Sequence, residues 1–381
     1  MFHLVFSLPW LFVVTRGIWP LPWTPGAKIA VSLLLLIASQ FHLCSRLSSG
    51  SVFNPEFPRP VVMLFNWLFG SVLLMAAFQL ALDLEALVAM IVSPEAARSS
   101  PVWPRYAIGI ASLMLAAFAV LQAVRTPPLK DVRIVIPHLP APFIGYTLVQ
   151  LTDLHISRLF TATWTRKVVD ATNRLGADLI VVTGDVIDGS VASRRGAVEP
   201  LRDLRAPDGV FLIPGNHEYL SGYQEWMKHL TSLGMSALAN AHTVIAREGG
   251  QIVIAGVTDH SARGAGKEPP NLDKALDGVP EAAPILLLDH APRNAPRASE
   301  RGVALQLSGH THGGMVWVLD RIVARANGGF VSGAYMVGGM TLYVSNGTGI
   351  WPGFALRLGR PSELTRFTLV RTAGYGREVK I

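Results

Sequence analysis

Cysteine is almost missing from the sequence: Cys44 is the single one in 381 residues, so no disulfide can form within the chain. Charge is also scarce, because Asp, Glu, Lys and Arg make up only 15% of the residues. The net charge of +7 is spread along the chain without a run of one sign, so we expect no nucleic-acid partner. Hydrophobic residues are plentiful at 50%, and the mean hydropathy is +0.37. This combination indicates membrane segments joined to a globular part.

Long apolar runs with almost no charge fill the first third of the chain. Ile29–Leu43, Val61–Leu82 and Tyr106–Val124 are each near the length that an α-helix needs to cross a bilayer. Met1–Val14 is a shorter fourth candidate, without the basic start or the small-residue cleavage site of a signal peptide. The alternative is a set of buried helices in a soluble core. Three such runs in one third of the chain favour a membrane domain over residues 1–126, with about four transmembrane helices.

The side of the membrane that carries the rest of the chain depends on the loops. With four spans, the N-terminus and the C-terminal domain share one side, and the loops on that side hold a slight excess of basic residues. These residues are Arg46, Arg59, Arg125, Lys130 and Arg133, against Arg16, Lys28, Arg98 and Arg105 in the opposite loops. The balance predicts a multi-pass protein of a bacterial inner membrane with a cytoplasmic C-terminal domain. An excess this small leaves both orientations open.

The composition changes after residue 126. Pro127 and Pro128 mark a linker, and we assign residues 127–147 to a linker with a leading strand and residues 148–381 to a globular domain. Short β-branched runs recur there, each followed by a polar cluster, as expected for buried strands. The runs are Thr147–Leu151, Leu179–Val182, Val210–Ile213, Ile252–Ala255, Ile285–Leu288 and Ala304–Leu307. Helical spacing in Thr163–Leu175 and Gln224–Leu233 separates some of them. Alternating strands and helices predict a layered α/β domain, with ligands bound beyond the carboxyl ends of its strands.

The polar clusters contain side chains that hold divalent metal ions in proteins. Asp153 and His155 are two residues apart, which in an extended chain points both side chains the same way. Carboxylates, imidazoles and an amide oxygen, without thiolates, suit borderline or hard divalent ions. The full set is Asp153, His155, Asp185, Asn216, His290, His310 and His312. Any single member could be a turn or cap residue beside glycine, but the ordered set favours a metal centre.

The order of these motifs resembles the calcineurin-like metallophosphoesterase superfamily, whose pattern is D-x-H, GD-x-x-D, GNH-E/D, a lone His and GHTH. The matching segments are Asp153-Leu154-His155, Gly184-Asp185-Val186-Ile187-Asp188, Gly215-Asn216-His217-Glu218, His290 and Gly309-His310-Thr311-His312. The preceding apolar segments resemble the bacterial membrane-anchored YkuE-like branch. The resemblance implies a four-layer α/β/β/α sandwich. Gly189 stands where the superfamily's protein Ser/Thr phosphatases carry Arg, and Arg293 stands where many relatives carry an acid.

The resemblance also implies a role for each matching residue. Asp153, His155 and His312 would hold one ion, whereas Asn216, His290 and His310 would hold the other. Asp185 would bridge the two ions, which could be Mn, Fe, Zn or Co. Such a pair lies about 3.5–4 Å apart and lowers the pKa of bound water to about 7. His217 would protonate the leaving group or stabilise the phosphoryl oxygens, and Asp188 would orient His217.

These features predict a membrane-anchored phosphoesterase that hydrolyses phosphomonoesters or phosphodiesters by means of hydroxide activated by two metal ions. The membrane anchor suggests a lipid-linked substrate, such as a nucleotide-sugar lipid, and contact with membrane lipids. A membrane sensor or scaffold with a non-catalytic phosphoesterase domain is the alternative, and a missing ligand would favour it. No ligand is missing. A transporter is disfavoured because the predicted spans carry acidic residues only at Asp83 and Glu85, near one end.

Overall fold

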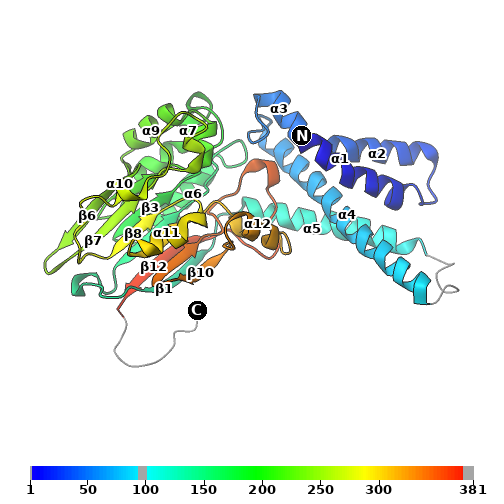
Figure 1. The fold of residues 1–381 in the computed structure, drawn as a ribbon. Coiled ribbons are helices and arrows are strands. Elements are labelled where there is room, and N and C mark those ends of the chain that lie inside the picture. The colour runs from blue at the N-terminus through cyan, green and yellow to red at the C-terminus, as the bar shows by residue number, and fades with distance from the viewer. Residues whose placement is uncertain (1, 93–100, 372–381) are drawn as a thin grey trace. The chain divides into compact units, whose positions relative to one another are not determined.

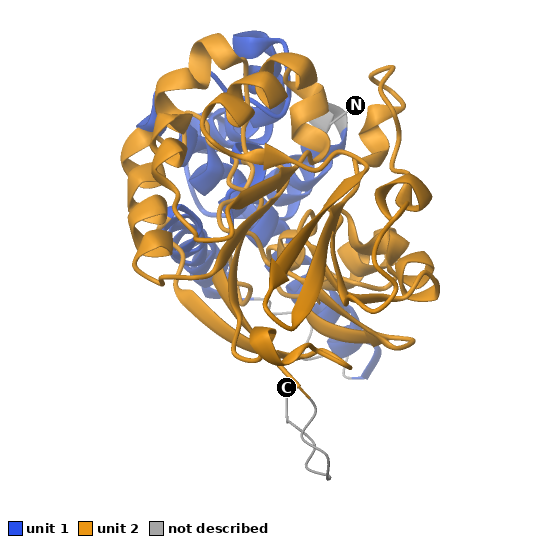
Figure 2. Ribbon diagram, turned by 90° about the vertical axis from the view of Figure 1, so that its left-hand side faces the viewer, with its two compact units in different colours: residues 1–124, 352–356 blue, residues 125–351, 357–381 orange. Residues whose placement is uncertain are grey.

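The computed structural model describes residues 2–92 and 101–371, so Arg98 and the last ten residues of the predicted globular domain lie outside the description. The chain forms two compact units (Figure 2). We call residues 1–124 with Pro352–Leu356 the helical unit, and residues 125–351 with 357–381 the sheet unit. The sequence analysis ended the membrane domain at residue 126 and the linker with its leading strand at residue 147. The sheet unit therefore includes the segment that was assigned to the linker.

Apolar helices make up the helical unit (Figure 1). They are α1 (Phe2–Phe12), α2 (Pro25–Ser39), α3 (Phe41–Ser49), α4 (Arg59–Val92) and α5 (Trp103–Val124), with a π-helical turn at Val13–Ile18. Two of them, α4 and α5, are long and apolar enough to cross a membrane. A third span is possible if α2 and α3, which meet at a bend of 53°, form one broken helix. Val5–Ile18 is a shorter apolar helix, so the described residues contain two or up to three candidate spans where the sequence predicted four.

Local sequence explains where α2 and α3 begin and end. Thr24 caps α2, because its side chain accepts a hydrogen bond from the backbone N–H of Ala27, and Pro25 fills the first turn. The end of α3 is fixed by Gly50, whose φ of 80° is the left-handed conformation that favours glycine after a helix.

The sheet unit contains two mixed six-stranded sheets. The first has the order β1-β12-β2-β3-β4-β5. Its strands are β1 (Leu129–Val135), β12 (Leu364–Val370), β2 (Thr147–Leu151), β3 (Leu179–Thr183), β4 (Val210–Ile213) and β5 (Ser236–Ala237). From β2 to β5 neighbouring strands are parallel, whereas β12 is antiparallel to β2 and parallel to β1. The last strand among the described residues therefore lies between the first two.

The second sheet has the order β10-β11-β9-β8-β7-β6. Its strands are β10 (Gly333–Val337), β11 (Met340–Val344), β9 (Val303–Ser308), β8 (Ile285–Leu288), β7 (Gly250–Gly256) and β6 (Ala241–Arg247). The four central strands are parallel, and the two edge strands are antiparallel to their neighbours. The six strands predicted from apolar runs are thus confirmed as β2, β3, β4, β7, β8 and β9.

The two sheets pack face to face around one apolar core. Leu148, Leu179 and Phe367 of the first sheet belong to the same buried cluster as Ile254 and Leu307 of the second. Helices lie outside the sheets (Figure 1). They include α6 (Ala162–Asn173), α7 (Val191–Val198) and α9 (Tyr223–Ser232), and, against the second sheet, α10 (Leu272–Ala275) and α11 (Ala295–Glu300). The arrangement is the predicted α/β/β/α sandwich, and the carboxyl ends of its central parallel strands carry the predicted metal ligands.

Candidate metal centre

The predicted ligands occupy turns in which the backbone is left-handed. The φ angles are 52° at Asp153, 46° at His155, 53° at Asp185, 69° at His310 and 50° at His312. These residues lack the freedom of glycine, and such strained positions cluster at functional sites. The expectation that Asp153 and His155 share a direction through an extended chain is therefore wrong. Left-handed residues after the strand turn both side chains into the site instead.

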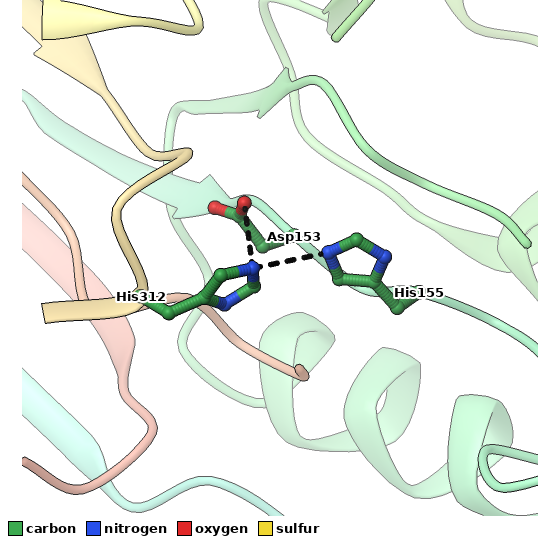
Figure 3. Close-up of side chains that lie close together, drawn as sticks. All are labelled: Asp153, His155 and His312. Carbon is green, nitrogen blue, oxygen red and sulfur yellow. Dashed lines mark hydrogen bonds and ion pairs between the residues drawn. The ribbon is translucent and has the colours of Figure 1, made fainter. Parts of the chain in front are cut away.

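The first group of ligands joins the end of β2 to the end of β9. Figure 3 shows the Nε2 atom of His312 pointing at Asp153 on one side and at His155 on the other. It lies 3.6 Å from Oδ1 of Asp153 and 3.3 Å from Nε2 of His155. All three side chains are buried. A cation placed between the two imidazole nitrogens could be bound by both of them.

The second group gathers around Asp185, which follows β3. Oδ2 of Asp185 lies 3.2 Å from Nε2 of His290 and 3.8 Å from Nε2 of His155. The side-chain oxygen of Asn216 lies 3.2 Å from Nε2 of His290 and 2.9 Å from Nδ1 of His310. Asp185 therefore faces both groups with one carboxylate oxygen, which is the position that a bridging ligand requires.

These separations fit metal binding. Two atoms that are each about 2.1 Å from one ion lie roughly 3–3.5 Å apart, and the observed spacings lie close to this range. The orientation of His290 fits as well, because its Nδ1 donates to the carbonyl of Thr183 at 2.7 Å and leaves Nε2 for an ion. His217 also lies near His155 and Asp185. Its Nε2 is 4.0 Å from Oδ2 of Asp185, the longest of these contacts.

Glycines allow the backbone to approach the ligands closely. A Cβ atom on Gly215 would overlap the carboxylate of Asp185, and one on Gly309 would overlap that of Asp153. Because the neighbouring atoms include backbone, a larger residue at Gly215 would displace the loop itself. The two motifs therefore require glycine for space rather than for flexibility.

Asp188 contacts two histidines rather than one. Its Oδ1 lies 2.5 Å from Nδ1 of His217, as the sequence led us to expect, and its Oδ2 lies 3.0 Å from Nδ1 of His155. Burial alone would lower the pKa of His217, but Asp185 and Asp188 outweigh it and raise this pKa to about 9. The two carboxylates therefore favour the protonated form of His217.

The two histidines of the GHTH motif have lowered pKa values, in contrast to His217. Burial is the main cause that lowers the pKa of His310 to about 4. Burial, followed by the charges of His155 and Arg357, holds the pKa of His312 well below its ordinary value. Both rings are therefore neutral at neutral pH, and a neutral imidazole is the form that binds a metal ion.

Glu218 shapes the loops of the site through backbone hydrogen bonds. This buried carboxylate accepts hydrogen bonds from three backbone N–H groups, those of Gly215 at 2.7 Å, Asp185 at 3.0 Å and Val186 at 2.7 Å. It thereby ties the loop after β3 to the loop after β4. The E/D position of the GNH-E/D pattern was the signal that could have indicated this role.

Arg357 is the residue of the site that sequence reasoning missed. Its buried guanidinium donates to the carbonyls of His312, Asn346, Gly349 and Arg360 over 2.6–3.1 Å. Burial lowers its pKa to about 10, so it remains charged at neutral pH. Arg357 therefore fixes the backbone of the predicted ligand His312, and no local motif around Arg357 carries a signal for this contact.

Comparison with known proteins assigns the chain to a family. The family model described as calcineurin-like phosphoesterase matches residues 146–314. A transmembrane protein with metallophosphoesterase domain from Danio rerio is 34% identical over 272 residues, or 68% of this chain and 61% of that protein. The metallophosphoesterase YkuE of Bacillus subtilis is 32% identical over 61% of this chain and 82% of its own length.

A metallophosphoesterase of Campylobacter jejuni is 32% identical over 68% of each chain. The chain belongs to the calcineurin-like metallophosphoesterases, as its motifs indicated. It spans 61% and 59% of the length of the Danio rerio relative and of a Helicobacter pylori metallophosphoesterase, respectively.

Proposed function

We propose that the protein is a membrane-bound, metal-dependent phosphoric ester hydrolase. The observation that carries the proposal is the position of Asp185, whose single carboxylate oxygen faces ligands of both groups. Asp153, His155 and His312 would hold one divalent ion, and Asn216, His290 and His310 the other. Bound ions would supply a hydroxide nucleophile near neutral pH and would polarise the phosphoryl oxygens.

The chain's own residues would orient the ester and move a proton. His217, held charged between Asp185 and Asp188, would donate its proton from Nε2 to the leaving oxygen, while its Nδ1 stays on Asp188. Asp188 would position both His217 and the ligand His155. Gly189 leaves the position after Asp188 without a guanidinium, which supports a substrate other than a phosphoprotein.

The substrate class that we propose is a phosphomonoester or phosphodiester at the membrane, such as a lipid-linked ester. Two observations support a multi-pass membrane protein: the apolar helices α4 and α5, and relatives named as transmembrane proteins. We propose residues 1–124 as the membrane domain and the sheet unit, from Arg125, as the catalytic domain.

The test is hydrolysis by the purified full chain with its metal content measured. We expect an aryl phosphomonoester or a bis-aryl phosphodiester to be cleaved in the presence of Mn²⁺, and a chelator to abolish the rate. A protein that carries two ions and cleaves neither ester would favour the sensor or scaffold alternative. No residue of the ligand set is replaced, which supports catalysis over that alternative.

A further inference from the structure

The surface beside the metal centre carries a concentrated apolar patch. Trp317, Val318 and Ile322 are 71%, 68% and 65% exposed, and Leu319 between them is 37% exposed. We call the segment from Trp317 to Ile322 the apolar strip. Other exposed large apolar residues of the sheet unit are spread over separate elements: Leu129, Ile144, Leu220, Val244 and Met336. Scattered single residues are ordinary on a protein surface, whereas a contiguous patch marks a contact with another apolar phase.

The backbone holds the apolar strip outward. Met315 and Val318 have φ angles of 63° and 85°, and a β-branched residue in this region is a marked outlier. The N–H of Trp317 donates to the carbonyl of Leu358 at 3.0 Å, and Leu358 donates to Met315 at 3.1 Å. These hydrogen bonds anchor the turn while leaving the side chains of Trp317 and Val318 exposed.

Basic residues accompany the apolar side chains. Helix α12 (Asp320–Ala326) begins within the strip and carries Arg321 and Arg325, both exposed and one helical turn apart. Asp320 pairs with Arg360 at 2.7 Å instead. Among the described residues, neither Arg321 nor Arg325 has an ion-pair partner. Exposed Trp and aliphatic side chains next to free arginines match the interface of an anionic bilayer, where rings lie at headgroup level and guanidinium groups meet lipid phosphates.

The strip is also joined directly to the metal centre. It begins five positions after the predicted ligand His312, and a Cβ on the intervening Gly314 would overlap Asp320. Arg357 donates to the carbonyl of His312 at 2.9 Å, and Arg360, three residues later, holds α12. These contacts leave little freedom between the strip and the predicted ligand His312. A strip that lies in the lipid headgroup region would therefore hold the metal centre near the headgroups as well.

We propose that the apolar strip inserts into the lipid headgroup region and that the centre acts on phosphoesters of bilayer amphiphiles. The second half of this proposal rests on the proposed phosphoesterase function. We assign the bilayer, rather than a soluble protein, as the partner of the apolar strip. The reason is that the sheet unit starts at Arg125, directly after the candidate span α5 ends at Val124. The covalent link keeps the sheet unit beside the membrane.

The insertion is tested without any activity measurement. In the full chain with Cys44→Ser, a nitroxide label is placed at Ile322→Cys or, as the matched control, at the exposed Ile144→Cys. The protein is reconstituted in vesicles of phosphatidylcholine with phosphatidylglycerol as the anionic component. We expect the label at 322 to be accessible to oxygen and shielded from a water-soluble nickel chelate, and the label at 144 to show the reverse. Equal nickel access at both sites would overturn the insertion, as would shielding of 322 from both reagents, which a protein partner would cause.

The substrate class is tested in the same vesicles with Trp317→Ser/Ile322→Ser and with Ile144→Ser as control. We expect the double variant to lose about ten-fold or more in rate on phosphatidic acid, equivalent to roughly 1.4 kcal/mol of lost apolar transfer, and to keep its rate on a soluble aryl phosphate. Equal losses on both esters, or no loss on either, would overturn the proposal. Wild-type cleavage of the aryl ester alone would overturn the lipid substrate and leave the phosphoesterase function standing. Cleavage of neither by metal-loaded protein would refute the proposed function itself.

Discussion

The helical unit and the sheet unit place apolar side chains in opposite ways. In the helical unit, large apolar residues such as Leu33, Ile110 and Phe118 are more than half exposed, whereas Asn66 and Gln79 are buried. The sheet unit buries its apolar residues between and outside two sheets. One rule explains both arrangements. Each unit exposes the side chains that its surroundings solvate, apolar ones toward lipid and polar ones toward water. The apolar strip is the part of the sheet unit whose exposed side chains are apolar, like those of the helical unit.

Buried polar groups also differ between the units. In the helical unit, Asn66 donates to the carbonyls of Val62 and Pro352 and accepts from the N–H of Ala355, so its amide is satisfied within the protein. In the sheet unit, the Nε2 atoms of His155 and His312 lie 3.3 Å apart, and Nδ1 of His312 has no hydrogen-bond partner among the described residues. The buried amide of Asn66 is thus paired within its own unit, whereas the two imidazoles belong to the predicted metal ligands.

The largest expected effect comes from the bridging carboxylate. Asp185→Asn should reduce the rate of ester cleavage by more than about 10³-fold, because both ligand groups lose their common negative charge. Metal content measured by elemental analysis should fall below two ions per chain. The matched change in the helical unit, Gln79→Leu, should leave metal content unchanged. Retention of both ions in Asp185→Asn would contradict the bridging assignment.

A comparable or smaller loss of rate, without loss of metal, is expected at the proposed acid. His217→Ala should keep both ions and lose roughly 10²–10⁴ in kcat on an alkyl phosphate, whose leaving group needs a proton. The loss should shrink on an aryl phosphate, and comparison of kcat for both esters checks this. An equal loss on both would assign His217 to stabilising the phosphoryl oxygens instead.

Asp188→Asn tests whether Asp188 acts by positioning its two histidine partners, in contrast to the proposed acid His217. Because Asp188 contacts the ligand His155 as well as His217, we expect this variant to lose metal affinity in addition to showing a milder form of the leaving-group pattern. Metal titration of Asp188→Asn beside His217→Ala measures the difference. Unchanged metal affinity would mean that His155 does not depend on its second partner.

The next prediction concerns the stability of the sheet unit when it is produced without the helical unit. A fragment that starts at Arg125 should fold without the helical unit, whereas one that starts at His138 lacks β1 together with the buried Ile134 and Ile136. The loss of each isoleucine should cost about 1.5–3 kcal/mol of unfolding free energy. Urea unfolding of both fragments measures it. Equal midpoints would show that β1 contributes nothing to the sheet unit.

The smallest effect lies at the edge of the sheet unit away from the metal centre. Asp178 accepts hydrogen bonds from the backbone N–H of Thr147 and from Arg247. Burial would raise the pKa of Asp178, but these donors outweigh it and hold the pKa below its ordinary value. Asp178→Ala should therefore destabilise the fragment from Arg125 by about 1–3 kcal/mol at neutral pH, since the N–H of Thr147 loses its acceptor.

The sign of the pH dependence follows from the lowered pKa. The contribution of Asp178 is complete above its unfolded pKa of about 3.9 and is lost as the pH falls through its folded pKa. The difference in urea midpoint between wild type and Asp178→Ala should thus shrink with acidification. A difference that grows toward acid would contradict the assignment.

Much of the sheet unit could be predicted because its central strands and its ligands have local signals. The bounds expected for β2, β4 and β8 match those observed, since fully buried parallel strands appear as continuous apolar runs. β12 was missed because its alternating burial gives a weaker signal, and its place between β1 and β2 depends on long-range pairing. Arg357 was missed for the same physical reason: its partners are backbone carbonyls, which leave no trace in the sequence.

The position of β12 has a consequence for biosynthesis. Strand β2 pairs with β12 on one side and β3 on the other, yet β12 is made last among the described strands. While a ribosome is still elongating the chain, helices α1 to α5 are complete, but β2 has an unsatisfied edge. Nascent domains generally fold as units, so the sheet unit must wait until Val370 has left the exit tunnel. During that interval the open edge of β2 is exposed to chaperones or to pairing with another nascent chain.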